Sequence, residues 1–410
     1  MHQPCCRFCQ SELSVTFADL GMSPLSNSYV PPERLRSMEP FYPLHAYVCG
    51  RCFLVQLEQF ESPEHIFSDY AYFSSYSESW LAHCRAYTQQ MRERFSLDGQ
   101  SQVVEIASND GYLLQYFLEA GIRVLGVEPA ANVAAVAREK GVPSEVAFFG
   151  VETARRLHAQ GLSADLLLGN NVLAHVPDIN DFVAGMRVLL KPEGQITMEF
   201  PHLLKLMQEN QFDTIYHEHF SYLSLVTVQR IFARHGLKLF DVEQLPTHGG
   251  SLRIYACHQE DPRPIGIQVS RLLKTERDYG LEQLDTYRKF EARVQETKRG
   301  LLEFLIAARQ QGKRVAGYGA PAKGNTLLNY CGVRTDLVEF TVDKSPHKQG
   351  RYLPGTHIPI LAPEAIQERR PDYLLILPWN LREEIVQQMS CIREWGGQFV
   401  VPIPQVKVCA

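Results

Sequence analysis

The stretch VVEIASNDGYLL, residues 103–114, decides the fold of this chain. Apolar and β-branched residues predict a strand, a polar turn with one glycine follows it, and an apolar helical pattern begins directly behind the turn. RVLGVEP, residues 123–129, predicts a second strand, and a second helical pattern ends at Gly141. The alternation continues to about residue 200 and predicts an α/β domain with a doubly wound parallel sheet.

The remaining sequence predicts two further parts, because 410 residues are too many for one ordinary core. Residues 1–65 are rich in Cys and Pro and predict a small metal-bound module. Residues 66–260 form the predicted central domain, whose lead-in begins aromatic and becomes helical. Residues 261–410 predict a long charged helical connector and then a second Rossmann-like α/β domain.

Composition excludes several classes of protein. The chain has 45% apolar and 21% charged residues and a net charge of −5, so we expect no broad basic surface for nucleic acid or an anionic membrane. No secretory signal and no membrane-spanning apolar run is apparent. We therefore expect a cytoplasmic protein whose thiols are reduced.

Two CxxC pairs, Cys6–Cys9 and Cys49–Cys52, predict a structural zinc site. Four thiolates complete a tetrahedral shell and leave no open position for catalysis. Cys5 could compete with Cys6, but the CxxC spacing favours Cys6. The alternatives are four reduced thiols or a redox pair, although neither CxxC lies in a thioredoxin-like strand–helix unit.

The turn after residue 106 lacks the full GxGxxG of dinucleotide binders and predicts a site for S-adenosylmethionine, which has a cationic amine and no phosphate. A carboxylate at the end of the second strand suits the two ribose hydroxyls, and polar residues after the third strand lie at the same sheet edge. An NAD site, or a Rossmann fold without ligand, is the alternative. The candidate cofactor residues are Glu105, Asn109, Asp110, Gly111, Glu128, Asn170 and Asn171, and His175 lies at the same edge.

YHEHFSY, residues 216–222, is the densest group of potentially catalytic side chains. Its histidines are two residues apart and are not the HExxH of a catalytic zinc site. A histidine of near-neutral pKa can remove a proton, while a phenol or carboxyl can orient it or stabilise an oxyanion. The turn at His248 could line the same cleft.

The predicted C-terminal domain has its own glycine-bearing turn, with Gly317, Gly319 and Gly324. Lys323 at the start of a predicted helix suggests an anion site. Asp343 could serve a ribose, so this turn could hold NAD or a sugar-nucleotide diphosphate, or could only complete the cleft.

The chain resembles the sugar C-methyltransferases of deoxysugar biosynthesis over essentially its whole length. The resemblance lies in the order of its motifs: CRFC (6–9), LGMSPLSNSYV (20–30), CGRC (49–52), EIASNDG (105–111), VEPA (127–130), NNVLAHVPD (170–178), YHEHFSY (216–222), HGGSLRIYA (248–256), GYGAPAKGNTLLNY (317–330), VDKSPHKQGRYLPGTHIPI (342–360) and LILPWN (375–380). Ala107 stands where many relatives have a glycine.

The resemblance implies a small zinc module, a class I methyltransferase domain and a second Rossmann-like domain. It implies methylation of carbon 3 of a nucleotide-bound 4-keto-6-deoxy sugar, usually carried on dTDP, after removal of the proton beside the ketone. His219 would be the base, with Tyr216 and Glu218 in the same active site. Expected substrate contacts are Tyr222, His175, His248, Lys323 and Asn325, and a monomer or dimer is expected.

Three other functions remain open at the sequence level. The same scaffold could methylate nitrogen, oxygen or a carbon outside a sugar. The chain could be a scaffold without enzymatic activity, or an NAD-dependent oxidoreductase that uses the C-terminal glycine turn.

Overall fold

The computed structural model describes residues 4–62, 75 and 78–409, and these residues form three β-sheets. The aromatic part of the predicted lead-in, residues 65–77, lies almost entirely outside the described residues. Its helical part is α2, Glu78–Phe95. Among the described residues, no helix combines the length and apolarity needed to cross a membrane.

The central sheet has seven strands in the order β10-β11-β8-β7-β4-β5-β6. Its strands run parallel except β11, which is antiparallel to both neighbours. This confirms the predicted doubly wound sheet, with β4 on the stretch that opened the sequence analysis. The strands are β4 Gln102–Ile106, β5 Arg123–Val127, β6 Ser144–Glu145, β7 Ala164–Asn170, β8 Leu190–Pro201, β10 Leu237–Leu245 and β11 Ser251–His258.

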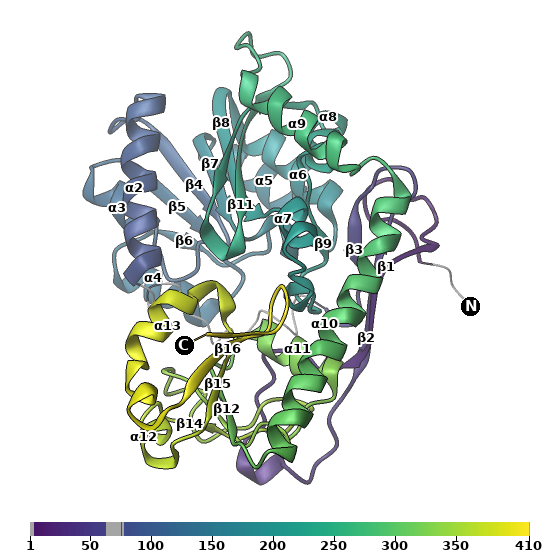
Figure 1. The fold of residues 1–410 in the computed structure, drawn as a ribbon. Coiled ribbons are helices and arrows are strands. Elements are labelled where there is room, and N and C mark those ends of the chain that lie inside the picture. The colour runs from purple at the N-terminus through teal and green to yellow at the C-terminus, as the bar shows by residue number, and fades with distance from the viewer. Residues whose placement is uncertain (1–3, 63–74, 76–77, 410) are drawn as a thin grey trace.

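Helices cover both faces of this sheet (Figure 1). Apolar residues of α2, α3 and α4 pack on one face, and those of α5, α6, α8 and α9 pack on the other. The helices are α3 Leu114–Glu119, α4 Ala131–Glu139, α5 Val151–Ala159, α6 Ile179–Leu189, α7 Leu203–Gln208, α8 Leu225–Arg234 and α9 Ile267–Tyr279.

The N-terminal module is a four-stranded sheet, and one of its strands comes from the central part of the chain. β1 Val15–Ser23, β2 Tyr42–Val48 and β3 Val55–Leu57 pair in sequence order, and β9 Ser221–Tyr222 adds to β3. Val55 pairs with Tyr222. The YHEHFSY segment is therefore fixed to the cysteine-bearing module.

The C-terminal domain is a six-stranded sheet of order β14-β13-β12-β15-β16-β17, parallel except for β17. The predicted helical connector is two helices, because Gly280 adopts φ 99° and ends α9 before α10 begins. The elements are α10 Leu284–Gln310, β12 Val315–Tyr318, α11 Ala322–Cys331, β13 Thr341–Val342, β14 Ile360–Leu361, α12 Ala365–Arg369, β15 Tyr373–Ile376, α13 Arg382–Gln388, β16 Gln398–Val401 and β17 Lys407–Cys409.

Short 3-10 turns lie between these elements. Two of them carry candidate site residues: the turns that contain His175 and His248. The turns are η1 Pro32–Arg34, η3 Leu173–His175, η4 Phe212–Thr214, η5 Thr247–Gly249, η6 Trp379–Leu381 and η7 Ser390–Trp395.

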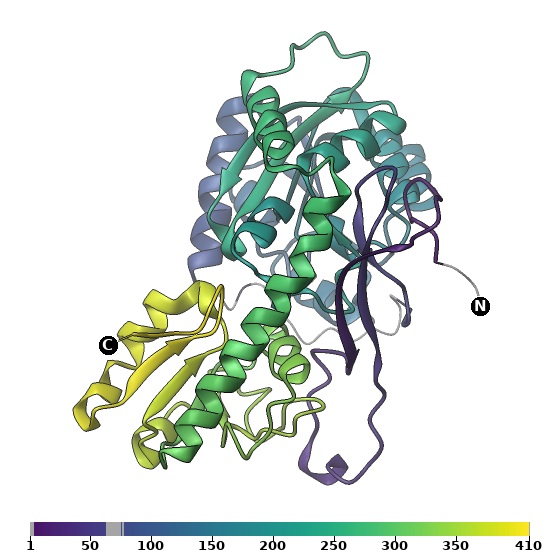
Figure 2. The ribbon, with the colours of Figure 1, turned by 45° about the vertical axis from the view of Figure 1, so that its right-hand side comes forward.

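The N-terminal module joins the other two domains. Its strands run beside α10 (Figure 1), where Phe17 stacks on Phe290 with ring centroids 4.5 Å apart. Its long β1–β2 connection extends to the C-terminal domain (Figure 2), where the backbones of Val30 and Tyr352 pair. Buried side chains of the module share one apolar core with α10 and the C-terminal sheet. The active-site elements of the three domains are thus held together by common packing.

Candidate active site and metal centre

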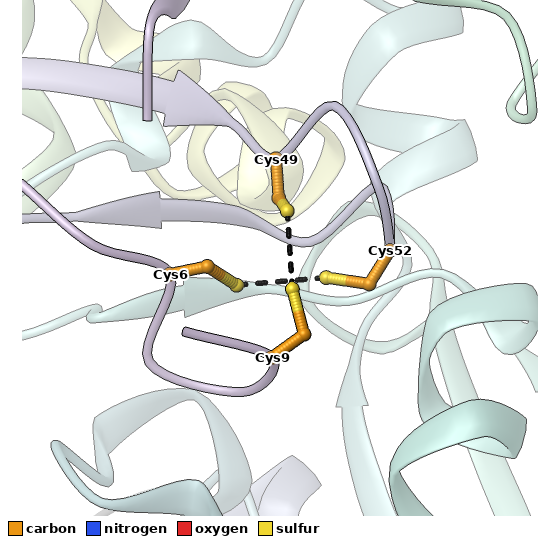
Figure 3. Close-up of side chains that lie close together, drawn as sticks. All are labelled: Cys6, Cys9, Cys49 and Cys52. Atoms are coloured by element: carbon orange, nitrogen blue, oxygen red, sulfur yellow. Dashed lines mark hydrogen bonds between the residues drawn. The ribbon is translucent and has the colours of Figure 1, made fainter. Parts of the chain in front are cut away.

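The four predicted zinc ligands come together. Cys6 and Cys9 lie in the first turn of the chain, and Cys49 and Cys52 flank the turn after β2 (Figure 3). Their sulfur atoms all lie within 4.8 Å of one another. A tetrahedral site with Zn–S bonds of about 2.3 Å requires sulfurs about 3.8 Å apart, so the group fits a zinc ion. Cys5 is exposed and outside the group.

Basic side chains lie beside this centre. Zn²⁺ with four thiolates has a net charge of −2, which needs compensation. A cavity of about 860 Å³ opens next to Cys9 and Cys52 and is lined by Arg51, Arg230 and Arg234. These arginines place positive charge beside the four thiolates, and Arg230 also pairs with Glu282.

Glu105 lies at the end of β4 with its carboxyl fully buried. Neither carboxylate oxygen has a hydrogen-bond donor at normal distance among the described residues, although the Tyr112 phenol lies beside it. Burial raises the pKa of Glu105 well above its usual range, and the carboxyls of Glu128 and Asp110 add to this effect. A buried acidic group without a cation is costly, so this environment fits the amine of S-adenosylmethionine.

Glu128 follows β5 and closes the same turn from the next strand. Its Oε2 accepts from the Asn109 backbone N–H at 2.9 Å and its Oε1 from the Ala130 N–H at 2.8 Å. Each oxygen retains a second lone pair, so the fixed carboxylate can still accept from ribose hydroxyls.

The turn between β4 and α3 is held in an unusual backbone conformation. Ala107 and Asn109 have φ of 56° and 49°, a region that glycine adopts at lower cost. Gly111 has φ 74°, and a Cβ there would lie 3.0 Å from the Val142 side chain. The glycine is therefore required by the turn and by packing against the segment before β6. Asp110 forms an ion pair with Lys140 at 2.9 Å.

The other predicted cofactor residues lie where β7 ends. Asn170 is its last residue and its side chain lies beside the Tyr112 phenol. Asn171 has φ 55°, and its Nδ2 lies 3.1 Å from Nε2 of His248. The structure thus brings the end of β7 next to the turn before β11.

His219 lies near His175 and His248 of the central domain and Lys323 of the C-terminal domain. Its Nδ1 lies 3.0 Å from the Thr214 carbonyl, so Nδ1 is the protonated nitrogen and Nε2 keeps its lone pair. Its ring lies 4.0 Å from that of Tyr216 and 4.6 Å from that of His175. Burial lowers the pKa of His219 well below its usual value, and the charges of His175 and Lys323 act in the same direction.

The first histidine of the motif points the other way. His217 Nε2 lies 3.2 Å from the Pro43 carbonyl and its ring packs edge-on to Tyr42 of β2. This side chain fixes the segment to the N-terminal module. Of the two histidines, it is His219 that lies with His175 and Tyr222.

Glu218 is buried between the motif and the N-terminal module. Its Oε1 accepts a 2.7 Å hydrogen bond from Nδ2 of Asn27. Burial raises the pKa of Glu218 to about 7, and the Asn27 bond opposes that rise. The carboxyl is thus close to its titration point near neutral pH. The ring of Tyr222 lies 6.2 Å from that of His219.

The C-terminal domain contributes a lysine to the surroundings of His219. Lys323 lies at the start of α11, with its Nζ 4.3 Å from the centre of the Trp379 ring and 2.8 Å from Oδ1 of Asn380. The Trp379 indole donates to the buried Asp213 carboxyl at 2.7 Å. Burial raises the pKa of Asp213 to about 6, while the Lys323 charge opposes the rise. Lys323 therefore places positive charge near His219, as an anionic substrate would require.

Asn325 lies in a contact between domains. Its Nδ2 donates to the Ser26 carbonyl at 2.6 Å, and the neighbouring Thr326 donates to the Ile215 carbonyl at 3.0 Å. Its Oδ1 has no hydrogen-bond donor among the residues described. In the structure, Asn325 joins α11 to the N-terminal module.

The C-terminal glycine turn is filled by protein. A Cβ at Gly317 would lie 2.7 Å from the Thr341 hydroxyl, and one at Gly319 would lie 2.6 Å from Pro378. The carboxyl of Asp343 accepts from the backbone N–H groups of Ala320 and Ser345, each at 2.8 Å. The glycines are explained by packing, and the acidic residue by the loop around it.

Sequence reasoning missed Asn27, Asp213 and Trp379. Asn27 lies in the motif of residues 20–30, but nothing in that loop distinguishes it from a solvated residue. Asp213 and Trp379 come from segments more than 160 residues apart. No local pattern could pair them.

S-adenosylmethionine requires two acidic groups at the edge of a doubly wound sheet. Glu105 at β4 suits its cationic amine, and Glu128 after β5 is placed for its ribose. The protein is a methyltransferase that depends on this cofactor. Three family models agree with this class. The "Putative zinc binding domain" matches residues 6–67, the "Methyltransferase domain" matches 80–242, and the "C-methyltransferase C-terminal domain" matches 246–404.

Known proteins define the family further. The C-methyltransferase NovU of Streptomyces niveus is 38% identical over 403 residues, which cover 98% of this chain and 96% of NovU. The chain therefore belongs to the C-methyltransferase family that includes NovU.

More distant proteins match only part of the chain. A ubiquinone biosynthesis O-methyltransferase of Chelativorans sp. (strain BNC1) is 32% identical over 94 residues, which cover 23% of this chain and 37% of that protein. The magnesium protoporphyrin IX methyltransferase of Synechocystis PCC 6803, solved with bound SAH, is 13% identical with a TM-score of 0.35, and the match covers 43% of this chain and 82% of that one.

Proposed function

We propose that this protein methylates carbon 3 of a nucleotide-linked 4-keto-6-deoxy sugar, with dTDP as the expected carrier. The observation that supports this most is the state of His219, whose Nδ1–H is held by the Thr214 carbonyl while Nε2 keeps its lone pair. A carbon acceptor needs a base beside an acidic C–H, and Nε2 is such a base.

His219 would remove the proton next to the ketone. The electrons of the broken C–H bond move onto the ketone oxygen, and the proton remains on Nε2. S-adenosylmethionine supplies the electrophilic methyl group that the enolate carbon then takes. Glu105, Asn109, Asp110, Gly111, Glu128, Asn170 and Asn171 are the proposed cofactor contacts.

The low pKa of His219 in the protein alone is consistent with an anionic substrate. Lys323 contributes to that low pKa. A diphosphate near Lys323 would offset its charge and make the imidazole a stronger base. We therefore propose Lys323 and His248 as contacts for the charged part of the substrate, and Tyr222, His175 and Asn325 as further contacts or supports of its pocket.

Tyr216 and Glu218 complete the proposed catalytic group. The Tyr216 ring packs on His219 and orients it. The Glu218 carboxyl, with a pKa of about 7, can exchange a proton in the same cleft. We further propose a cytoplasmic enzyme that acts as a monomer or dimer, with neither nucleic acid nor a membrane as its partner.

The test is mass spectrometry of products formed from S-adenosylmethionine and a freshly prepared dTDP-4-keto-6-deoxyhexose. We expect a gain of one CH₂ unit in mass, and deuterium exchange at carbon 3 in D₂O. Both should fall by about 10²–10⁴-fold in His219→Asn while cofactor binding stays unchanged. Methylation on oxygen or nitrogen, or full exchange in His219→Asn, would contradict the proposal.

A further inference from the structure

The Asn27–Glu218 contact joins the N-terminal module to the catalytic segment. Asn27 itself is exposed, but its Nδ2 reaches the buried Glu218 carboxyl at 2.7 Å. Within the described part of the chain, Asn27 is the one side chain that donates a hydrogen bond to that carboxyl. Because Asn27 is exposed, its replacement can change the position and ionisation of Glu218 without removing a side chain from the apolar core.

The loop that carries Asn27 is clamped on both sides of it. The Ser26 carbonyl accepts from Asn325 at 2.6 Å, and the Tyr29 hydroxyl donates to the Ala320 carbonyl at 2.6 Å. Both partners belong to the C-terminal domain. Contacts between the N-terminal module and the C-terminal domain therefore fix the position of Asn27, which in turn contacts Glu218 of the central domain.

The Glu218 segment is held from the same module. His217 contacts the backbone of Pro43, and β9 begins three residues after Glu218 and pairs with β3. β3 starts three residues after the zinc ligand Cys52. The module thus fixes the backbone around Glu218 as well as its side chain.

We propose that Asn27 is a positioning residue of the active site, which holds the Glu218 carboxyl in place through the hydrogen bond from its Nδ2. The proposal rests on the function proposed above for the role of Glu218 in turnover. It gives the N-terminal module a part in catalysis in addition to binding zinc.

Few other groups face Glu218. The Tyr29 phenol approaches from the same loop, and the His175 imidazole lies against the Glu218 backbone. Neither donates to the carboxyl in the structure. Removal of Asn27 should therefore leave the carboxyl without a donor and disfavour its charge.

The direct test follows the titration of Glu218 by NMR with ¹³C-labelled glutamate, the signal being assigned by its loss in Glu218→Gln. The wild-type midpoint should lie at about pH 7. It should rise by about one pH unit in Asn27→Ala. Asn27→Asp keeps the shape, removes the donor and adds a like charge, so its rise should be larger. Ser28→Ala, at an exposed position of the same loop, is the control and should not change the midpoint.

Activity gives the second readout. In both Asn27 variants kcat at pH 7 should fall about tenfold, the pH profile should shift upward, and KM for S-adenosylmethionine should not change. Recovery of kcat at higher pH would separate this role from a merely structural one. An unchanged Glu218 midpoint in both variants would overturn the proposal. Absence of activity in the wild-type protein on the keto sugar would contradict the proposed function alone, because the titration needs no substrate.

Discussion

The two α/β domains have the same kind of turn after their first strand, and the structure uses them differently. At the end of β4, the acidic Glu105 is buried beside the Tyr112 phenol and the carboxyls of Glu128 and Asp110, and Ala107 is held at positive φ. After β12, the glycines pack against Thr341 and Pro378, and the Asp343 carboxyl accepts from the backbone N–H groups of Ala320 in this turn and Ser345 in its own loop. At the first turn the buried carboxyl lacks a cation, which a ligand could provide. At the second turn the carboxyl has its hydrogen bonds within the protein.

The difference shows that a glycine pattern alone does not identify a ligand site. At both turns a glycine prevents a clash within the protein. What separates them is the acidic residue, because a buried carboxyl ionises readily only beside a cation, and at the first turn a cationic ligand would supply that charge. The C-terminal domain contributes Lys323 and Trp379, which lie close to Asp213 and His219.

The largest effect should come from Glu105→Gln. The substitution keeps the shape but removes the charge that would pair with the cofactor amine. We expect affinity for S-adenosylmethionine, measured by isothermal titration calorimetry, to fall by at least about 30-fold. The free energy of unfolding should stay the same or rise, because an unpaired buried acid is removed. An unchanged affinity of Glu105→Gln for S-adenosylmethionine would contradict the view that the first turn, unlike the second, binds a ligand through its acidic residue.

The matching substitution in the second turn, Asp343→Ala, should have the opposite pattern. It leaves two backbone N–H groups without an acceptor, so the free energy of unfolding should fall by about 2 kcal/mol. Affinity for S-adenosylmethionine should not change, and labelled NAD should bind neither the wild type nor the variant. Saturable NAD binding would show that the second turn is also a ligand site.

Glu218 gives a pH dependence of moderate size. Its pKa in the folded protein is about 7, above the ordinary value, so the fold favours the neutral carboxyl. The contribution of Glu218 to the free energy of unfolding is fully present at pH values below its pKa in the unfolded chain. It is lost as the pH rises through about 7. Glu218→Gln should therefore gain stability relative to wild type from pH 5 to pH 8.

The same titration should appear in the rate. If the carboxylate is the active form, kcat should rise with pH through about 7, and this limb should be absent from Glu218→Gln. Thermal unfolding and initial rates across this pH range measure both effects. Parallel profiles for the two proteins would contradict the assignment.

The smallest effect should come from Ala107→Gly. Glycine adopts φ 56° without the cost that alanine bears, so unfolding should become harder by about 1 kcal/mol or less. Ala137→Gly, inside α4, should act in the opposite direction by a similar amount. A loss of stability in both variants would mean that the first turn is not held under strain.

Much of the fold could be predicted because its signals are local. The period of the apolar residues located β4, β5 and β7, and CxxC spacing located the four zinc ligands. The connector could not be divided into two helices from its charged helical pattern alone. Only the left-handed conformation of Gly280 showed the break.

The site was predictable in its residue types and less so in its assembly. The YHEHFSY motif gave both histidines, but only contacts with Pro43 and Thr214 show which one faces the cleft. The pairing of β9 with β3 and the Asn27–Glu218 bond join residues far apart in the chain. Such contacts depend on how the three domains pack, and that information is not present in any short window of sequence.

The central claim is methyl transfer to carbon, and the most direct measurement is NMR of the product formed with S-adenosylmethionine labelled with ¹³C in its methyl group. The account predicts a labelled methyl group bonded to carbon 3 of the keto sugar, with no such product from His219→Asn. A labelled methyl group on oxygen or nitrogen, or at a carbon that is not adjacent to the ketone, would contradict it.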